Sequence, residues 1–259
     1  MLLTINSSGR VLDLFTVVAP EWGVTQVAGE LGMSKSKAHS LLASLSDVGL
    51  LRRTDRGRYR LGWRLLGLNR VLTDTTDFRC QARPVLEALC GHFGETVHLG
   101  ALDDGRIVYV DRIQGRGAAP IPVSATGSAM PAHATGVGKV LLAHLAPAVL
   151  DAVVERHGLP ALTKRTITDV DDLRDQLALV RARGFAVDGE EAVPGISCVA
   201  ARIVGVDGDV VAAISIAAPT GRMNARRKAF EVAVVRAGRY VSRQLRSPAG
   251  DATPVAALQ

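Results

Sequence analysis

The residues of this chain that could do chemistry are a glycine-rich run and a few scattered polar side chains. The run Thr135–Lys139 is similar to a phosphate-binding loop, but such a loop needs glycine where this chain has His133. It also needs Ser or Thr where the chain has Val140. The sequence contains neither a Gly-x-Ser-x-Gly motif nor a His-Glu-x-x-His motif. We therefore expect no catalytic residues and no enzyme.

Metal-ligating residue types occur in the C-terminal part, but without the spacing of a metal site. They are His133, Asp188, Glu190 and Cys198. Structural zinc sites place their ligands at short, regular intervals, which these residues lack. The cysteines are odd in number and equally irregular: Cys80, Cys90 and Cys198. We expect no metal, no cofactor and no disulfide framework, as in the reducing cytoplasm.

Positive charge is concentrated near the N-terminus. The net charge is +6, and residues 1–70 hold ten Lys or Arg against five Asp or Glu. Such a local field attracts polyanions, usually nucleic acid, although a solubilising surface would carry the same charge. No apolar stretch approaches the roughly 20 residues of a membrane span, and the N-terminus lacks the features of a signal peptide. We expect a cytoplasmic protein that does not contact a membrane.

The basic segment predicts three helices. They are residues 10–19, which Pro20 ends, a short helix that Thr25 caps, and a helix that Ser34 caps and that runs to Asp47. Apolar residues of the third recur at helical spacing, at Ala38, Leu41, Leu42 and Leu45. A tight turn at Leu31–Met33 joins the second helix to the third, which is typical of a helix-turn-helix.

The opposite face of the third helix is short, polar and basic, as a recognition helix in the major groove requires. The residues that we expect to contact DNA from these helices are Thr25, Ser34, Lys35, Ser36, Lys37, His39 and Ser40. A plain three-helix bundle with a solvated polar face would show the same pattern. The segment that follows therefore has to decide between the two interpretations.

Residues 50–61 alternate around an Asp-Arg-Gly turn, which predicts a β-hairpin. We expect Tyr59 and Leu61 to pack inward and Arg58 and Arg60 to project from the other face. A basic hairpin directly after a recognition helix suits a wing that holds the phosphate backbone. The wing residues that we expect to contact DNA are Arg52, Arg53, Arg58 and Arg60.

Beyond the wing the pattern predicts a linker helix over residues 63–78 and an α+β domain over 79–247. The linker has an apolar stripe of Leu65, Leu68 and Leu72, which could pair with a second chain or pack within one. In the domain we expect helices at 84–93, from the glycine-rich run to Leu145, at 169–183 and at 225–245. We expect strands at 96–102, 107–113, 197–206 and 210–217, and a disordered tail over 248–259.

Four segments, in this order, resemble the isocitrate-lyase-regulator (IclR) family of bacterial transcription factors. They are Ser34–Leu42, Gly57–Gly62, Pro131–Ala143 and Arg183–Ala200. The resemblance implies a winged helix-turn-helix domain at 1–62, the linker helix, and a GAF-like effector-binding domain. It also implies a homodimer or tetramer that binds double-stranded operator DNA under the control of a small organic acid, and it favours a repressor. The alternative is a ligand-independent architectural DNA-binding protein.

The family's effector positions correspond here to Gly136, Val137, Asp188, Cys198 and Ser215. A second family serine is replaced by Ala217, which makes the expected pocket less polar. Without the resemblance, the glycines fit a tight turn before a helix and Cys198 fits a small buried residue. Departures from the family pattern are Lys37, Ser40 and the pair Ala201-Arg202, which replaces a small residue followed by proline.

Overall fold

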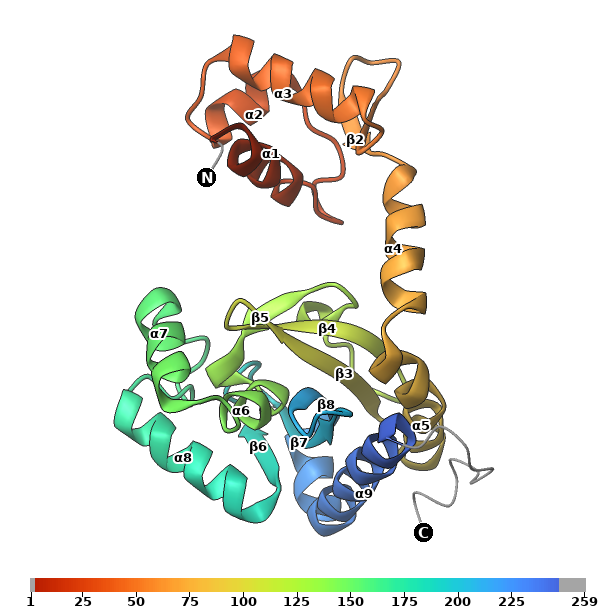
Figure 1. The fold of residues 1–259 in the computed structure, drawn as a ribbon, viewed down its shortest axis with the longest axis vertical. Coiled ribbons are helices and arrows are strands. Elements are labelled where there is room, and N and C mark those ends of the chain that lie inside the picture. The colour runs from red at the N-terminus through yellow and green to blue at the C-terminus, as the bar shows by residue number, and fades with distance from the viewer. Residues whose placement is uncertain (1–2, 247–259) are drawn as a thin grey trace. The chain divides into compact units, whose positions relative to one another are not determined.

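A computed structural model describes residues 3–246, and the chain divides into two compact units after Thr75 (Figure 1). The expected tail at 248–259 lies outside the described residues. None of the helices in residues 3–246 combines the length and the apolar character that a membrane span requires. The elements of the N-terminal unit are α1 (Leu3–Asp13), α2 (Val24–Glu30), α3 (Lys35–Asp47), β1 (Leu51–Arg53), β2 (Tyr59–Leu61) and α4 (Arg64–Asp74).

The N-terminal unit is a winged helix built around one small apolar core. The predicted stripe of α3 packs there against α1 and α2, and Leu51 and Tyr59 join it from the hairpin. The hairpin is antiparallel, with Arg52 opposite Arg60. Trp22 adds a bridge to Tyr59 through backbone hydrogen bonds of 3.0 and 2.8 Å. The helix-turn-helix and the wing therefore share one core.

The prediction of a first helix at 10–19 is wrong, because the helix ends at Asp13. The indole N–H of Trp22 donates to the carbonyl oxygens of Leu14 and Ala19, at 2.8 and 3.2 Å, and holds the segment between them as a loop. A helical backbone is also unfavourable for a residue that directly precedes a proline, and Ala19 precedes Pro20.

Two local predictions in this unit are also wrong. Thr25 does not cap α2: Gly23 is the N-cap, and its N–H donates to the side-chain oxygen of Gln26 at 3.1 Å. Leu61 does not pack inward, since 43% of it is exposed, whereas Leu51 opposite it in the hairpin is buried. The strand pair ends at Leu61, so no further layer covers that side chain.

α4 corresponds to the predicted linker helix but is shorter, and none of its residues is buried. Leu68 and Leu72 of the predicted stripe are 49% and 67% exposed, and Leu66 and Val71 are also exposed. Packing within the unit therefore does not cover the apolar residues of this helix.

The C-terminal unit is a six-stranded antiparallel sheet with helices on both faces, in the strand order β5-β4-β3-β8-β7-β6. Its strands are β3 (Thr96–Asp103), β4 (Arg106–Ile113), β5 (Ala129–Pro131), β6 (Phe185–Gly189), β7 (Ile196–Val204) and β8 (Val210–Pro219). Its helices are α5 (Asp77–Phe93), α6 (Gly136–Leu142), α7 (Pro147–His157), α8 (Val170–Arg183) and α9 (Thr220–Arg246), with 3-10 turns η1 (Pro122–Ser124) and η2 (Ala132–Ala134).

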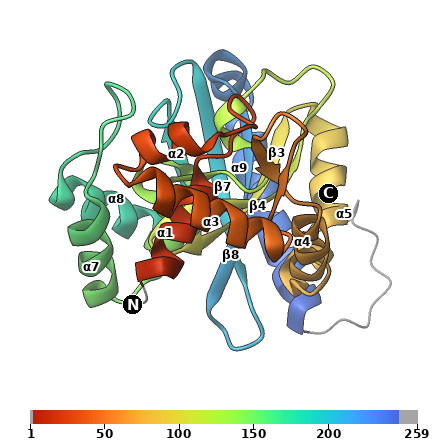
Figure 2. The same cartoon turned by 90° about the horizontal axis from the view of Figure 1, so that it is seen from above.

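Each face of this sheet has its own apolar core. α5 and α9 cover one face, and α6, α7 and α8 cover the other (Figure 1). The turn between β7 and β8 projects beyond these layers (Figure 2). The α+β class is confirmed, whereas α7, β5 and β6 were not predicted. The helix expected to begin at Pro84 begins at Asp77 and includes the proline.

Gly138 lets α6 approach η2 closely. A Cβ atom at this position would lie 2.0 Å from the carbonyl oxygen of Ala132. Because that neighbour is backbone rather than a flexible side chain, the helix would have to move. Gly138 therefore fixes where the N-terminus of α6 lies.

We expect Gly138→Ala to lower the free energy of unfolding by about 1–3 kcal/mol, the usual effect of overpacking. Gly91→Ala is the matched control, since a Cβ there would meet nothing within 4 Å. At this position in the last turn of α5 that change should instead stabilise by about 0.5–1 kcal/mol. Urea unfolding of the full chain measures both, and equal effects at the two glycines would contradict this account of α6.

Candidate DNA interface and effector site

The N-terminal part of α3 presents the polar face that the sequence predicted. Ser34 caps the helix, with its hydroxyl oxygen accepting from the Lys37 N–H at 3.2 Å. Ala38 and the rest of the apolar stripe are buried. The predicted DNA-contacting residues of α3 and its cap are all exposed: Ser34, Lys35, Ser36, Lys37, His39 and Ser40. Thr25 is also exposed, in the first turn of α2.

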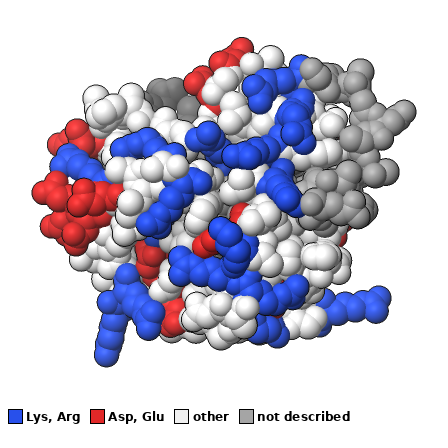
Figure 3. Space-filling view, turned by 90° about the horizontal axis from the view of Figure 1, so that it is seen from below, with Lys and Arg blue, Asp and Glu red and all other residues white. Residues whose placement is uncertain are grey.

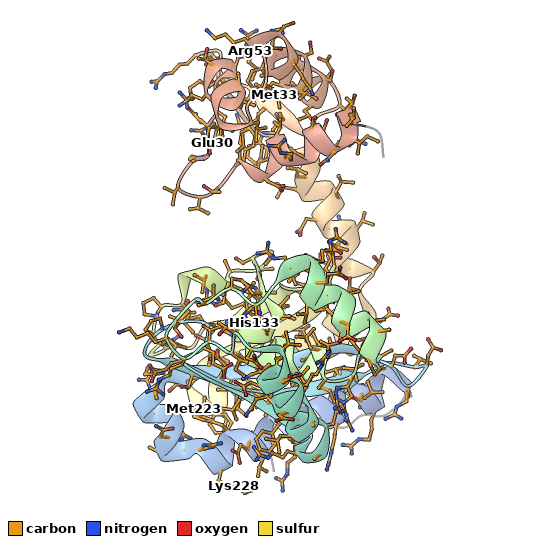
Figure 4. All side chains as sticks on the ribbon, turned by 90° about the vertical axis from the view of Figure 1, so that its left-hand side faces the viewer. Glu30, Met33, Arg53, His133, Met223 and Lys228 are labelled. Carbon is orange, nitrogen blue, oxygen red and sulfur yellow. The ribbon has the colours of Figure 1, made fainter. Side chains whose placement is uncertain are left out.

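The turn between α2 and α3 is held by backbone hydrogen bonds. Gly32 has a φ of +61°, in the left-handed region that glycine adopts freely. The Met33 N–H then donates to the Ala28 carbonyl at 3.0 Å. Glu30 and Met33 mark the two sides of this turn in Figure 4. The geometry fixes α3 against α2, which a helix-turn-helix requires.

The wing arginines differ in their partners. Arg58 and Arg60 both form ion pairs with Glu21, and Arg58 also donates to the Glu21 carbonyl at 2.7 Å. Arg52 lies over the Trp63 ring, 5.2 Å from its centroid. Arg53 is exposed near the wing turn (Figure 4). Two of the predicted phosphate contacts are therefore already bonded to a carboxylate, which the sequence analysis missed.

The five predicted effector residues lie on the face of the sheet that α6 covers. Asp188 and Cys198 are opposite each other in the β6–β7 ladder. A Cβ atom on Gly136 would lie 3.7 Å from both the Asp188 nitrogen and the Cys198 Cβ. Ser215 is buried in β8, and Val137 is buried in α6. Residues up to 79 positions apart thus converge on the N-terminus of α6.

Asp188 is the most perturbed acid of this group. Its Oδ1 accepts from the Glu191 N–H at 2.6 Å, and only 2% of the residue is exposed. Burial raises the pKa of Asp188 from 3.8 to about 7, and the nearby Glu191 carboxylate adds to the rise. Burial and Asp188 likewise raise the pKa of the Cys198 thiol. Near neutral pH the site can therefore hold a proton on Asp188.

A buried ion pair lies beside Asp188. The Lys139 ammonium donates to Glu191 Oε1 at 2.5 Å, and 1% of Lys139 is exposed. His133 is buried nearby in the C-terminal unit (Figure 4), and its Nε2 lies 3.2 Å from the Pro160 carbonyl oxygen. Burial lowers the pKa of His133. Within residues 3–246, no group of three His, Cys, Asp or Glu is placed to hold a metal ion.

The sequence analysis missed two polar side chains on the same face, His98 and Tyr109, whose rings lie 4.9 Å apart. His98 Nε2 is 2.8 Å from the Ser124 hydroxyl, which itself donates to the Ile121 carbonyl at 3.1 Å. His98 therefore donates from Nε2. Burial lowers its pKa to about 3, so the ring is neutral. Because side chains alternate between the two faces of a strand, the sequence could have predicted that His98 lies on the same face of β3 as Gly100.

Family models match both units. The model for "Bacterial transcriptional regulator IclR C-terminal" matches residues 71–243, and the "IclR helix-turn-helix domain" model matches residues 8–55. The chain belongs to the IclR family. The HTH-type transcriptional regulator XynR of Escherichia coli (strain K12) is 36% identical over 248 residues, which cover 95% of this chain and 98% of that protein.

Other IclR-family proteins agree with this assignment. The transcriptional repressor IclR of Escherichia coli (strain K12) is 30% identical, over 92% of this chain and 89% of that protein. A solved IclR homolog from Microbacterium hydrocarbonoxydans, complexed with 4-hydroxybenzoate, has a TM-score of 0.82 at 26% identity and covers 94% of this chain and 99% of that one. The chain is a transcriptional regulator with a helix-turn-helix DNA-binding domain, and the predictions of family, fold class and non-enzyme are confirmed.

If Arg58 and Arg60 contact phosphate as predicted, Glu21 competes for them, so we expect Glu21→Gln to strengthen binding of non-sequence-specific DNA several-fold. The slope of log affinity against log salt should steepen by about 0.9 for each additional phosphate that the wing neutralises. Glu30→Gln, an exposed glutamate in the same IclR helix-turn-helix, is the matched control. Fluorescence anisotropy over a salt series measures both, and a shallower slope in Glu21→Gln would contradict the competition.

The raised pKa of Asp188 predicts a pH-dependent stability. Between about pH 4 and pH 7 the folded regulator keeps a proton that the unfolded chain loses. The free energy of unfolding must then fall as pH rises through this window, by at most about 1.4 kcal/mol per pH unit for one proton. Asp188→Asn removes the titrating group and keeps the Oδ1 acceptor. The free energy of unfolding of this variant, relative to that of the native chain, should therefore rise from pH 5 to pH 8.

Urea unfolding at both pH values measures this difference. Asp175→Asn is the control, because it makes the same change at an exposed position on α8. A difference between Asp188→Asn and the native chain that is equal at pH 5 and pH 8 would show that Asp188 is ionised in the folded state.

Proposed function

We propose that this IclR-family regulator is a repressor whose binding to operator DNA is controlled by a small organic acid in the C-terminal unit. The observation that carries the proposal is the convergence of Gly136, Asp188 and Cys198 at the N-terminus of α6. The IclR homolog solved with 4-hydroxybenzoate supports the class of ligand. We further propose that the regulator acts in the cytoplasm as a homodimer or tetramer.

The amides at the start of α6 suit a carboxylate, because a helix N-terminus directs N–H groups and a positive dipole end at an anion. Thr135 already accepts from the Gly138 N–H at 2.9 Å, so the amides for the ligand are those of Gly136 and Val137. Ser215 supplies a hydroxyl, and Cys198 and Ala217 make the remaining wall less polar. A protonated Asp188 donates to the ligand instead of repelling it.

We infer that effector binding moves α6 relative to the sheet. Gly136 is in van der Waals range of Ala200, at 3.4 Å from an added Cβ, and Val137 and Ser215 are buried. A ligand among these residues therefore favours a conformation in which the helix lies farther from β7. A ligand changes DNA binding only as far as it binds the two conformations unequally.

On the DNA side, we propose that α3 enters the major groove and that the wing contacts phosphates. Lys35, Lys37 and Ser40 are the residues of α3 best placed to reach base edges or phosphates. Arg52 and Arg53 supply phosphate contacts from the wing, and Arg58 and Arg60 do so when phosphate displaces Glu21. Thr25, Ser34, Ser36 and His39 complete the surface.

A ligand-independent architectural DNA-binding protein would have the same N-terminal unit. The two functions differ in the C-terminal unit, since only a regulator of the proposed kind shows saturable thermal stabilisation by an organic acid. A thermal-shift series with keto, hydroxy and aromatic acids, 4-hydroxybenzoate included, separates them.

We expect Ser215→Ala to weaken binding of the acid that gives the largest saturable shift by about ten- to a hundred-fold. A hydrogen bond to a charged group contributes roughly 1.5–3 kcal/mol, which corresponds to that range. Ser40→Ala is the control, because it lies on α3 and should alter operator preference without changing acid affinity. Isothermal titration measures the acid, and an unchanged affinity in Ser215→Ala would place the effector elsewhere.

A further inference from the structure

A second polar pocket lies on the other side of the C-terminal unit, between α9 and the ends of β6 and β7. It has a volume of about 270 Å³, and three arginines of α9 line it: Arg239, Arg243 and Arg246. Lys and Arg side chains are spread over the face drawn in Figure 3, while most acidic side chains gather at its left edge. None of the residues that line the pocket is acidic.

The pocket is built on a close contact between α9 and β7. A Cβ atom on Gly238 would lie 2.4 Å from the Arg202 carbonyl oxygen, so the helix rests directly on the strand. Ser242 is buried and joins the two elements: its hydroxyl donates to the Gly238 carbonyl at 2.6 Å and accepts from the Val204 N–H at 2.8 Å.

The spacing of the arginines places them on one side of α9. Arg239, Arg243 and Arg246 are four and three residues apart, which brings them onto one helix face. Arg239 and Arg243 are exposed. Arg202 of β7 contributes only backbone to the pocket, because its side chain bonds to His144 on the face of the sheet that α6 covers.

The positive charge of these arginines is not neutralised by the protein. In the described part of the chain, none of the three forms an ion pair with a carboxylate. Arg246 donates to the Ser242 carbonyl at 3.3 Å.

We propose that this arginine-lined pocket binds a small anion that carries several negative charges on oxygen, either a phosphate ester or a polycarboxylate. Guanidinium groups bind such oxyanions through paired hydrogen bonds, and a bound anion would relieve the repulsion among the arginines. The volume is below the roughly 300–1,000 Å³ of pockets for drug-sized ligands, which favours a compact anion over a large one. The site is separate from the α6 effector site, so the regulator would respond to a second chemical signal.

The test uses the full-length protein with pyrophosphate and with citrate, each at constant ionic strength, in isothermal titration. We expect saturable binding of at least one probe, and the preferred probe identifies the phosphate or the polycarboxylate class. Arg239→Ala and Arg243→Ala should each weaken that binding about tenfold, because each removes a charge-assisted contact. Arg116→Ala, which removes an exposed arginine from a loop of the same unit, should leave it unchanged.

Failure of both probes to saturate, or an equal loss of binding in Arg116→Ala, would overturn the proposal. A second result would also overturn the proposal: the native protein binds neither probe, and Arg239→Ala and Arg243→Ala change its oligomeric state or the salt dependence of its DNA binding. The arginines would then belong to a protein or DNA interface. Ser215→Ala should bind the probe normally. The proposal of an anion site and the proposal of an effector site can therefore be contradicted independently of each other.

Discussion

The buried ion pair between Lys139 and Glu191 joins α6 to the segment between β6 and β7, and the proposed effector site depends on it. Burying two charges costs several kcal/mol per ion, and an apolar pair of similar volume is often at least as stable. Further bonds offset part of that cost here, because the Gly189 N–H donates to Glu191 Oε1 at 3.3 Å and the Thr166 hydroxyl donates to the Glu191 carbonyl at 2.7 Å. Glu191 thereby places its own N–H on Asp188, so the pair sets the environment of the acid that we assign to the ligand.

The N-terminal unit uses charge in the opposite way, at its surface. Its core is a small apolar cluster, and Arg52, Arg53, Arg58 and Arg60 lie on the hairpin beside it. Glu21 holds Arg58 and Arg60 in place before DNA arrives, which reduces the side-chain entropy lost on binding. In the proposed DNA complex, phosphate has to break or share the same contact. The Glu21 carboxylate therefore orders the wing in advance and, in the proposed complex, lowers the affinity of the wing for phosphate.

Local patterns predicted what local forces determine. The stripe of α3 and its Ser34 cap were predicted correctly because helical spacing and capping involve residues close in sequence. The end of α1 was not, because it depends on a bond from Trp22. β6 has five residues and was named only as part of a family motif. For the proposed effector site, the family resemblance predicted Gly136, Asp188 and Cys198. The pairing of Lys139 with Glu191, 52 positions away, has no signal in the sequence.

The charges within the C-terminal unit constrain what the proposed effector site can bind. His98 is neutral, Lys139 is already paired, and Asp188 is neutral only while it holds a proton. No unpaired cation among these residues is available to a ligand carboxylate. Helix amides, a hydroxyl and one proton must therefore compensate an incoming negative charge, and these groups act only over short distances. Such a site discriminates by the position of hydrogen-bonding groups rather than by net charge, because a misplaced carboxylate would be buried without compensation.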